Sequence, residues 1–248
     1  MNVVYVMWLR QLKRFFRAKS RIIGALGQPL LFLFALGFGL SPVFQQAGKG
    51  NYINFLVPGI VAMSVLFTSM FSGIEIIWDR QFGFLKETLV APVSRMQIMI
   101  GRTLGGATVS VFQGIIILAL SYFAGFRLMS ISSFLLALVF MTLIALTFTA
   151  LGTAIASGID DFHGFQMIMN FLVMPLFFLS GALFPLNGLP KVIGIIARIN
   201  PLSYGVDGLR AALEGTSFYG LPFDLGILAA LTFVLLVLGS YMFSKIQV

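Results

Sequence analysis

The sequence of 248 residues contains no cysteine and is poor in charge. The absence of cysteine excludes disulfides, thiolate metal sites and a catalytic thiol. Charged residues make up 10% of the chain, whereas soluble domains carry roughly 25%. Because so little charge cannot cover a water-facing surface, the composition excludes an ordinary soluble domain.

Sequence patterns for nucleotide chemistry and metal binding are also missing. No GxxxxGK[ST] stretch occurs, so the chain has no phosphate-binding P-loop of its own. The single histidine, His163, lies near Asp160 and Asp161, but no third ligand is in reach, and we interpret this cluster as a solvated turn. We therefore expect no catalytic residue, no metal site and no cofactor bound by this chain.

Charge is absent from the centres of the apolar stretches. Glu75 and Arg102 stand at segment ends, from which long side chains are expected to reach water. Carriers driven by protons or sodium ions usually need ionisable groups or broken helices near the middle of the membrane. An ion-driven carrier or channel is therefore disfavoured, and it stays open as an alternative.

Apolar residues dominate what is present. They make up 59% of the chain, and the mean hydropathy is +1.01. A bilayer crossing needs about 20 mostly apolar residues. Six stretches reach this length: 22–42, 55–77, 104–126, 132–156, 165–184 and 223–243. We predict an all-α integral membrane protein, a single domain with six transmembrane helices.

The first 21 residues form an amphipathic pattern. One helical stripe consists of Arg10, Arg14, Arg17 and Arg21. The opposite face is aromatic and aliphatic, which is typical of a helix lying in the membrane interface. A cleaved signal peptide is disfavoured, because the basic cluster is long and no clear cleavage site follows it. The net charge of +8 is concentrated beside apolar stretches, so we expect contact with membrane lipid and not with nucleic acid.

The distribution of Lys and Arg predicts the orientation, because these residues are enriched in cytoplasmic segments. With the N-terminus inside, eleven of them lie in cytoplasmic segments and five lie outside. The inside set is Arg10, Lys13, Arg14, Arg17, Lys19, Arg21, Arg80, Lys86, Arg95, Arg102 and Lys245. We therefore predict a multi-pass protein of the cell membrane with both termini in the cytoplasm.

Residues 78–102 form a polar interruption between two apolar stretches, and the orientation places this segment in the cytoplasm. The pattern predicts a short helix, a turn and the start of a second helix. Pro92 disfavours a helical Ala91, and Ser94 with Gln97 forms a capping-box pattern before the next apolar run. One face of the short helix consists of Phe84, Leu85, Thr88 and Leu89. Such a face packs into a partner's groove, against lipid, or onto its own bundle, and the pattern does not choose between them.

Residues 185–222 contain two apolar pieces that are too short to span a bilayer. Asn200 followed by Pro201 predicts the start of the second one, a short helix to about residue 213. Asp207, Arg210 and Glu214 fall on one face of it and are expected to pair. Two short helices on the outer side imply a re-entrant hairpin, which is either a lid at an outer exit or a scaffold. The predicted lid residues are Asn200, Pro201, Asp207 and Arg210.

Two stretches resemble the membrane subunits of type-2 ABC exporters, the ABC type-2 permeases. They are DRQFGFLKETLVAPVSRMQIMIGRTLGG at 79–106, with its E-x-x-x-x-PVSR form, and FPLNGLPKVIGIIARINPLSYGVDGLRAAL at 184–213. The resemblance covers nearly the whole chain. It implies an N-terminal interfacial helix, six spans, a cytoplasmic coupling helix between spans two and three, and short outer helices before span six.

The resemblance also implies partners. Two separately encoded ABC ATPase subunits would bind ATP and Mg²⁺ and hydrolyse ATP, while this chain, a transporter subunit and not an enzyme, would pair with a second permease copy, as a homodimer or heterodimer. The coupling helix would dock into a groove on each ATPase. The implied contacts are Arg80, Phe84, Leu85, Lys86, Glu87 and Leu89.

The amino-acid sequence of these stretches resembles the drug and antibiotic-resistance branch of the family more than the glycan-exporting branch. Spans rich in Phe and Leu also favour a hydrophobic or amphiphilic cargo, such as a drug, an antibiotic or a lipid-like molecule. Export of a polysaccharide or glycolipid by the same mechanism is the alternative. A membrane anchor that moves no cargo also stays open.

Overall fold

The computed structural model describes residues 2–46, 51–90, 92–187 and 190–244, without the side chains of Arg21, Leu89 and Ser244. Within these ranges the secondary structure is helical and no strand occurs. The elements are α1 Val3–Arg17, α2 Lys19–Gln46, α3 Tyr52–Phe71, α4 Ile74–Gln81, α5 Phe84–Val90, α6 Arg95–Ser121, the 3₁₀ helix η1 Tyr122–Ala124, α7 Ile131–Ser157, α8 Phe162–Phe178, α9 Lys191–Ile199, α10 Pro201–Glu214 and α11 Leu221–Ser244.

Five helical stretches in the described part of the chain are long and apolar enough to cross a membrane. They are Ile22–Gln46, Tyr52–Gln81, Arg95–Ala124, Ile131–Ser157 and Leu221–Phe243. The predicted crossing at 165–184 corresponds to α8, which has only 17 residues and ends at Phe178. At 1.5 Å per residue it spans about 25 Å, less than a hydrocarbon core of about 30 Å. The chain turns after α8, where Gly181 has a φ of 80°, so the six-span layout stays a prediction.

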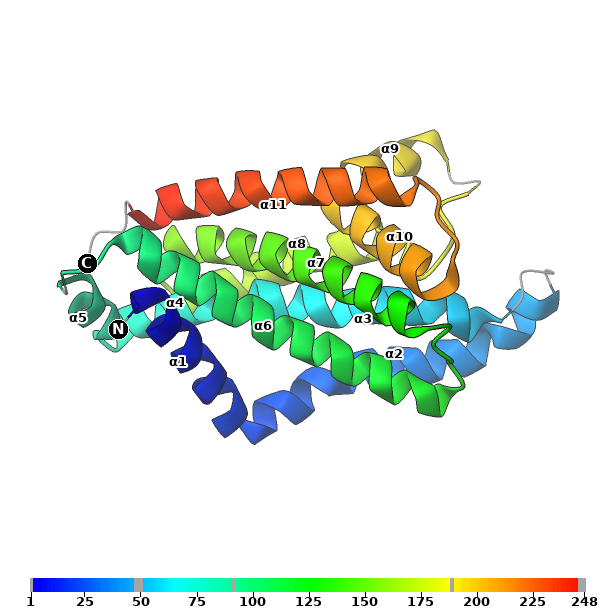
Figure 1. Cartoon of the computed structure of the whole chain (residues 1–248), viewed down its shortest axis with the longest axis horizontal. Helices are drawn as coiled ribbons and strands as arrows, with labels where there is room; N and C mark the ends of the chain where they lie inside the picture. Colours follow the sequence, from blue (N-terminus) through cyan, green and yellow to red (C-terminus); the bar gives the residue numbers. More distant parts are fainter. Residues whose placement is uncertain (1, 47–50, 91, 188–189, 245–248) are drawn as a thin grey trace.

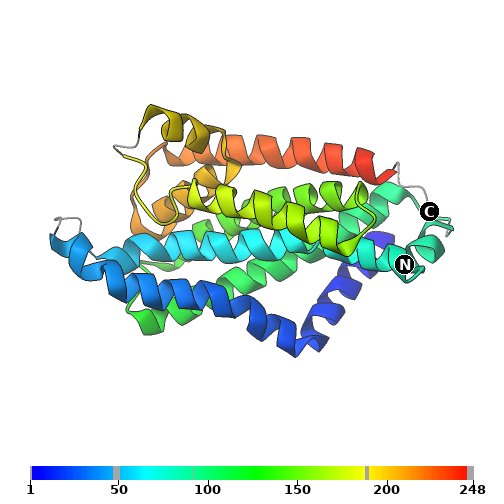
Figure 2. The same cartoon turned by 180° about the vertical axis from the view of Figure 1, so that it is seen from behind.

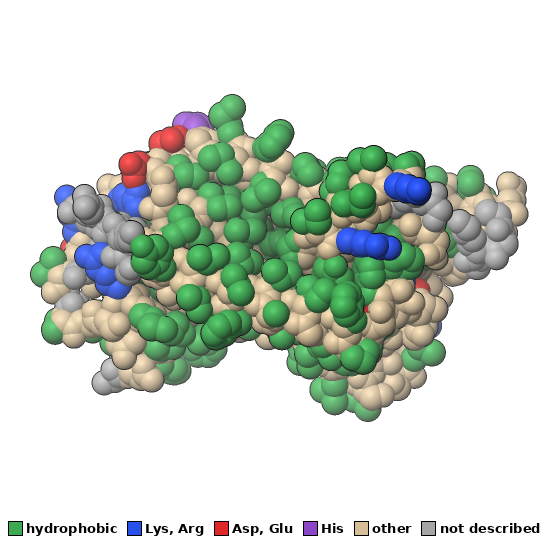
Figure 3. All heavy atoms as spheres, turned by 90° about the horizontal axis from the view of Figure 1, so that it is seen from above, with side chains coloured by type: hydrophobic (Ala, Val, Ile, Leu, Met, Phe, Trp, Pro, Cys, Tyr) green, Lys and Arg blue, Asp and Glu red, His purple; other side chains and the backbone are tan. Residues whose placement is uncertain are grey.

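The helices form an elongated bundle with α3 at its centre (Figures 1 and 2). The most apolar stretch of α3 has 78% of its residues buried inside the bundle, and α2, α6, α7 and α10 pack around it. In the most apolar stretches of α2 and α11, only 17% of the residues are buried. Figure 3 shows hydrophobic side chains across the middle of one face, with Lys and Arg towards its two ends. This distribution is the one expected for a bundle whose middle faces lipid.

Glycines bring several helices into close contact. An ideal Cβ at Gly73 would lie 2.4 Å from the carbonyl oxygen of Gly152, which leaves no room for a side chain. On α6, a Cβ at Gly101 would lie 2.7 Å from Cβ of Met7, and one at Gly105 would lie 2.6 Å from Cβ of Gln11. Because Gly101 and Gly105 are four residues apart, they form one small-residue face on which α1 packs. The predicted interfacial helix is therefore also a packed part of the bundle.

The 185–222 segment contains α9 and α10, which differ in burial. As predicted, Asn200 caps α10 by accepting a hydrogen bond from the amide of Leu202 at 3.0 Å, and Pro201 is the first helical residue. Most of α10 is buried against α3, α7 and α11, whereas α9 exposes apolar side chains such as Val192 and Ile195. Packing of α10 between spans favours a scaffold role for this helix.

Candidate functional site

The beginning of α1, the end of α11 and the short helices α4 and α5 lie at the same end of the bundle (Figures 1 and 2). A glycine and a proline set where the short helices at this end begin and stop. Gly83, with a φ of 78°, separates α4 from α5, and α5 ends at Val90, shortly before Pro92. The next helix begins at Arg95 after Ser94, whose side chain makes no capping hydrogen bond. The capping-box pattern therefore predicted the helix start correctly, but the side-chain bond that it implies does not form.

A buried carboxylate, Asp79, is the centre of the charged cluster here. Arg10 binds it with two hydrogen bonds, of 3.0 Å to Oδ2 and 2.7 Å to Oδ1. Arg102 donates to the same Oδ2, and NH1 of Arg14 lies 3.5 Å from Oδ1. Arg14 also lies 3.8 Å from Glu75. Two carboxylates thus join the N-terminal helix to α4 and α6.

This cluster corrects the expectation that Glu75 and Arg102 reach water. Both residues are buried, and the side chain of Arg102 exposes only 3% of its surface. A buried guanidinium is tolerated when a carboxylate neutralises it and accepts its hydrogen bonds. Asp79 supplies that carboxylate from 23 residues earlier in the chain.

Aromatic rings extend the cluster to α5 and α8. The guanidinium carbon of Arg10 lies 4.0 Å from the ring centre of Phe84, the first residue of α5. Arg14 lies 5.3 Å from the ring centre of Trp78, which stacks on Phe162 at 6.1 Å. Cation–π contacts of this length are attractive. The positions of α1, α4, α5 and α8 are therefore mechanically linked.

Arg80 lies on α4 and points away from this cluster. It forms an ion pair with Asp160 and donates to the carbonyl oxygens of Ile159 at 3.3 Å and Ser157 at 3.2 Å. The loop between α7 and α8, which the sequence indicated as a solvated turn, is thereby held to α4. Arg80 was expected to contact an ATPase, and in this structure it binds its own chain.

The predicted face of α5 divides between the core and the surface. Leu85 is 0% exposed and belongs to the hydrophobic core, so it anchors α5 to its own bundle and is not available as a surface contact. Lys86 and Glu87 are exposed, as are the neighbouring Phe82 and Val90, at 83% and 85%. Phe84 is half-buried against Arg10, and the side chain of Leu89 is outside the described part of the structure.

A groove of about 820 Å³ runs between α1 and the loop before α5. Its lining combines cations of the predicted basic face, Arg10, Arg14 and Arg17, with the apolar Phe82 and Phe84. Lys13 and Arg17 are exposed along it, while Arg10 and Arg14 reach the buried carboxylates. The side chain of Arg21 is not described. The basic stripe therefore has two separate functions, internal neutralisation and a charged surface.

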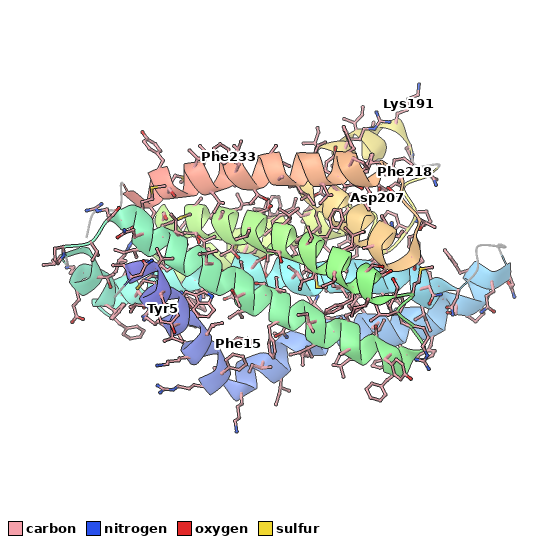
Figure 4. The ribbon with its side chains drawn as sticks, in the orientation of Figure 1. Tyr5, Phe15, Lys191, Asp207, Phe218 and Phe233 are labelled. Atoms are coloured by element: carbon pink, nitrogen blue, oxygen red, sulfur yellow. The ribbon has the colours of Figure 1, made fainter. Side chains whose placement is uncertain are left out.

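A second cavity, of about 280 Å³, lies deeper, between α1, α2, α3 and α6. Its walls are mainly apolar and include Phe15, Met63 and Phe67, and Figure 4 shows Phe15 near the junction of α1 and α2. Its polar members include Gln11, Gln28, Thr68, Ser72 and Glu75. Such a mixture fits an amphiphilic molecule with a small polar group.

Sequence reasoning missed Asp79, Glu75 and Gln11 as members of these sites. The available signal was the scarcity of acidic residues, eight in the chain, of which two lie within four residues of each other next to an apolar stretch. A buried acid needs a cation. The sequence alone did not indicate which of the 16 Lys and Arg residues it would meet.

Comparisons with known proteins agree with this architecture. Residues 2–213 match the model of the family described as ABC-2 type transporter. "Putative transport permease ycf38" of Cyanophora paradoxa is 32% identical over 211 residues, which cover 84% of this chain and 72% of that protein. The protein of the same name from Porphyra purpurea is 29% identical over 93% of this chain and 83% of its own length. "Nodulation protein J" of Rhizobium leguminosarum bv. trifolii is 29% identical over 85% of this chain and 78% of its own length.

Proposed function

The chain belongs to the ABC-2 type transporter family, and on that basis we propose that it is the membrane-spanning permease subunit of an ATP-driven exporter. Two ABC ATPase subunits on the cytoplasmic side would supply the energy, with ATP and Mg²⁺ bound to them. The subunit would lie in the cell membrane with both termini in the cytoplasm. Its relatives include proteins named transport permeases, which supports a transport role without catalysis by this chain.

The arrangement of α5 supports coupling to an ATPase. Its exposed residues, Lys86, Glu87 and Val90, offer charge and apolar surface to a partner, while Leu85 fixes the helix to the bundle. Phe84 touches Arg10, which binds Asp79, and Asp79 binds Arg102 on α6. A push on α5 would therefore reach α1, α4 and α6 without passing through a mobile linker. Arg80 would act within the chain, by holding α4 to the α7–α8 loop.

We propose an amphiphilic or hydrophobic small molecule as the cargo. The supporting observation is the cavity of about 280 Å³, whose walls are mostly apolar with polar groups from Gln11, Gln28 and Glu75. A second copy of the chain would complete the path, because α2 and α11 leave most of their apolar surface uncovered. The exposed α9, and not the packed α10, would be the movable part of an outer lid.

A vesicle assay tests this function. The permease is purified with the ABC ATPase that binds it, reconstituted, and supplied with a fluorescent amphiphile and with a lipid-linked oligosaccharide. Movement of the amphiphile that requires Mg²⁺ and ATP supports the proposal. Movement of the oligosaccharide alone favours the glycan alternative, and movement without any ATPase favours a carrier. Tight ATPase binding with no movement of either compound would indicate an anchor.

A further inference from the structure

A large cavity lies at the other end of the bundle from α5. This distal cavity has a volume of about 950 Å³ and is bordered by the start of α3, the loop after η1, the turn after α8 and the end of α10. Its lining includes Asn54, Phe55, Phe126, Ser203, Arg210 and Glu214. Because it is built at the ends of apolar helices, it lies at the depth of lipid headgroups when the bundle spans a membrane.

Four charged side chains line the distal cavity, and two of them, Asp207 and Arg127, form hydrogen bonds within the protein. Asp207 accepts hydrogen bonds from the Ser217 hydroxyl and from the amides of Phe218 and Tyr219, at 2.8–2.9 Å. Figure 4 shows Asp207 and Phe218 close together at this end. Arg127 donates to the carbonyl oxygens of Tyr122 and Phe126 at 3.0 and 3.2 Å. Asp207 therefore does not form the predicted pair with Arg210.

The other two charges, Arg210 and Glu214, have unused polar atoms. Arg210 is 9% exposed, donates one hydrogen bond to the carbonyl oxygen of Gly181 at 3.0 Å, and lies 4.1 Å from the ring centre of Phe55. Its Nε is buried and has no acceptor among the described residues. Oε1 of Glu214 is buried and has no donor among the same residues. Both charged side chains border the distal cavity and retain hydrogen-bonding capacity that the described residues do not use, so a ligand in the cavity can engage them.

The helix α10 sets the distance between Arg210 and Glu214. They are four residues apart on α10, which places their Cβ atoms about 5–6 Å from each other. Burial raises the pKa of Glu214 and lowers the pKa of Arg210, and each opposite charge counteracts the shift. A ligand that satisfies both must offer a negative and a positive group at a similar spacing.

We propose that the distal cavity binds a zwitterionic headgroup that carries a phosphate and a primary ammonium. The phosphate accepts hydrogen bonds from Arg210, and the ammonium donates to Glu214. A two-carbon linker, as in ethanolamine phosphate, separates these groups by a length comparable to one helical turn. The exposed Met129 and Phe218 provide apolar surface for the adjoining glycerol or acyl groups. The site requires only that the bundle spans a membrane, and it does not depend on the export function.

Calorimetric titration of the purified chain in a non-ionic detergent tests this site. The probes are dihexanoyl phosphatidylethanolamine, dihexanoyl phosphatidylglycerol, which lacks the ammonium, and free ethanolamine phosphate. We expect saturable binding of the ethanolamine lipid and at least tenfold weaker binding of the glycerol lipid. Glu214→Gln should weaken binding of the ethanolamine lipid about tenfold, since one charge-assisted hydrogen bond is lost. Equal binding of free ethanolamine phosphate would identify a soluble zwitterion as the source, and binding of the lipid alone would identify a membrane lipid.

Charge reversal keeps the test independent of simple loss of folding. Glu214→Lys should reverse the preference, so that the glycerol lipid binds better than the ethanolamine lipid. Lys191→Gln is the matched control, because Lys191 is exposed on α9 and does not line the cavity. Equal affinity for the two lipids, an unchanged affinity in Glu214→Gln, or displacement of the ethanolamine lipid by glucose would overturn the proposal.

Discussion

Asp79 and Arg102 lie 23 residues apart in the chain and form an ion pair whose side chains expose only 5% and 3% of their surface. The pair connects α4 to α6, and Arg10 joins it from α1. Three helices that contribute to one end of the bundle therefore depend on a single carboxylate.

Asp79→Asn should destabilise the protein by about 3–5 kcal/mol, because it leaves the buried Arg102 uncompensated. Thermal unfolding in detergent measures the change. Asp160→Asn is the control, since the side chain of Asp160 is 88% exposed in its ion pair with Arg80 and its loss should cost less than about 1 kcal/mol. Combining Asp79→Leu with Arg102→Met should recover most of the stability; no recovery would contradict the assigned cause.

The packing of α1 gives a second prediction. Gly101→Leu should force α1 away from α6, because even a Cβ at this position would lie 2.7 Å from Met7. Overpacking of this kind costs about 1–3 kcal/mol. Hydrogen–deuterium exchange should rise over residues 3–17. In the control, Gly27→Leu, exchange should not change, since a Cβ at Gly27 has no neighbour within 4 Å.

On α5, core and surface positions should respond differently. Glu87→Arg should leave the melting temperature unchanged and weaken capture of the ABC ATPase at least fivefold, since Glu87 is exposed. Leu85→Asp should instead lower the stability by several kcal/mol, because Leu85 is fully buried. Both variants are compared by melting and by pull-down of the ATPase. A stable Leu85→Asp protein, or undiminished capture by Glu87→Arg, would refute this division.

Filling the smaller cavity should block transport without affecting assembly. Gly24 lines this cavity, and a Cβ there has no neighbour within 4 Å, so Gly24→Phe can enter the space without a backbone clash. We expect at least a tenfold loss of amphiphile movement in vesicles with normal ATPase capture. Gly27→Phe on the same helix is the matched control, because its Cβ is equally open and Gly27 does not line the cavity. Equal loss in both variants would argue against a cargo site there.

The stability of the protein should depend on pH through Glu214. Burial raises the pKa of this carboxyl, and the positive charge of Arg210 partly opposes the rise. A carboxyl whose pKa is higher in the folded state contributes stability at low pH, and that stability is lost as the pH rises through the folded value. Glu214→Gln should therefore melt at a higher temperature than the parent protein at neutral pH, and the difference should disappear towards about pH 4, the ordinary value for a glutamate. A difference that grows on acidification would contradict this assignment.

Hydropathy and local backbone rules explain what the sequence determined by itself. Long apolar stretches of Phe, Leu and Ile predicted membrane helices, and the described structure has five that are long enough. Pro92 predicted the end of α5, and Asn200 with Pro201 predicted the start of α10. These signals depend on neighbouring residues only, so they are readable along the chain. The sequence stretches at 79–106 and 184–213 also indicated the ABC-2 family, which the family match confirms.

Only the tertiary structure decided which groups meet. The sequence pattern of Arg10 and Arg14 is typical of a lipid-facing surface, but in the structure their side chains form ion pairs with Asp79 and Glu75. The apolar pattern around Leu85 was equally compatible with a partner's groove and with the core of this chain, and in the structure Leu85 packs into the core. Helical periodicity specifies that a face is apolar or charged, but not what covers it. That choice depends on contacts between residues as far apart as Arg10 and Asp79, which close approach of glycines on α6 makes possible.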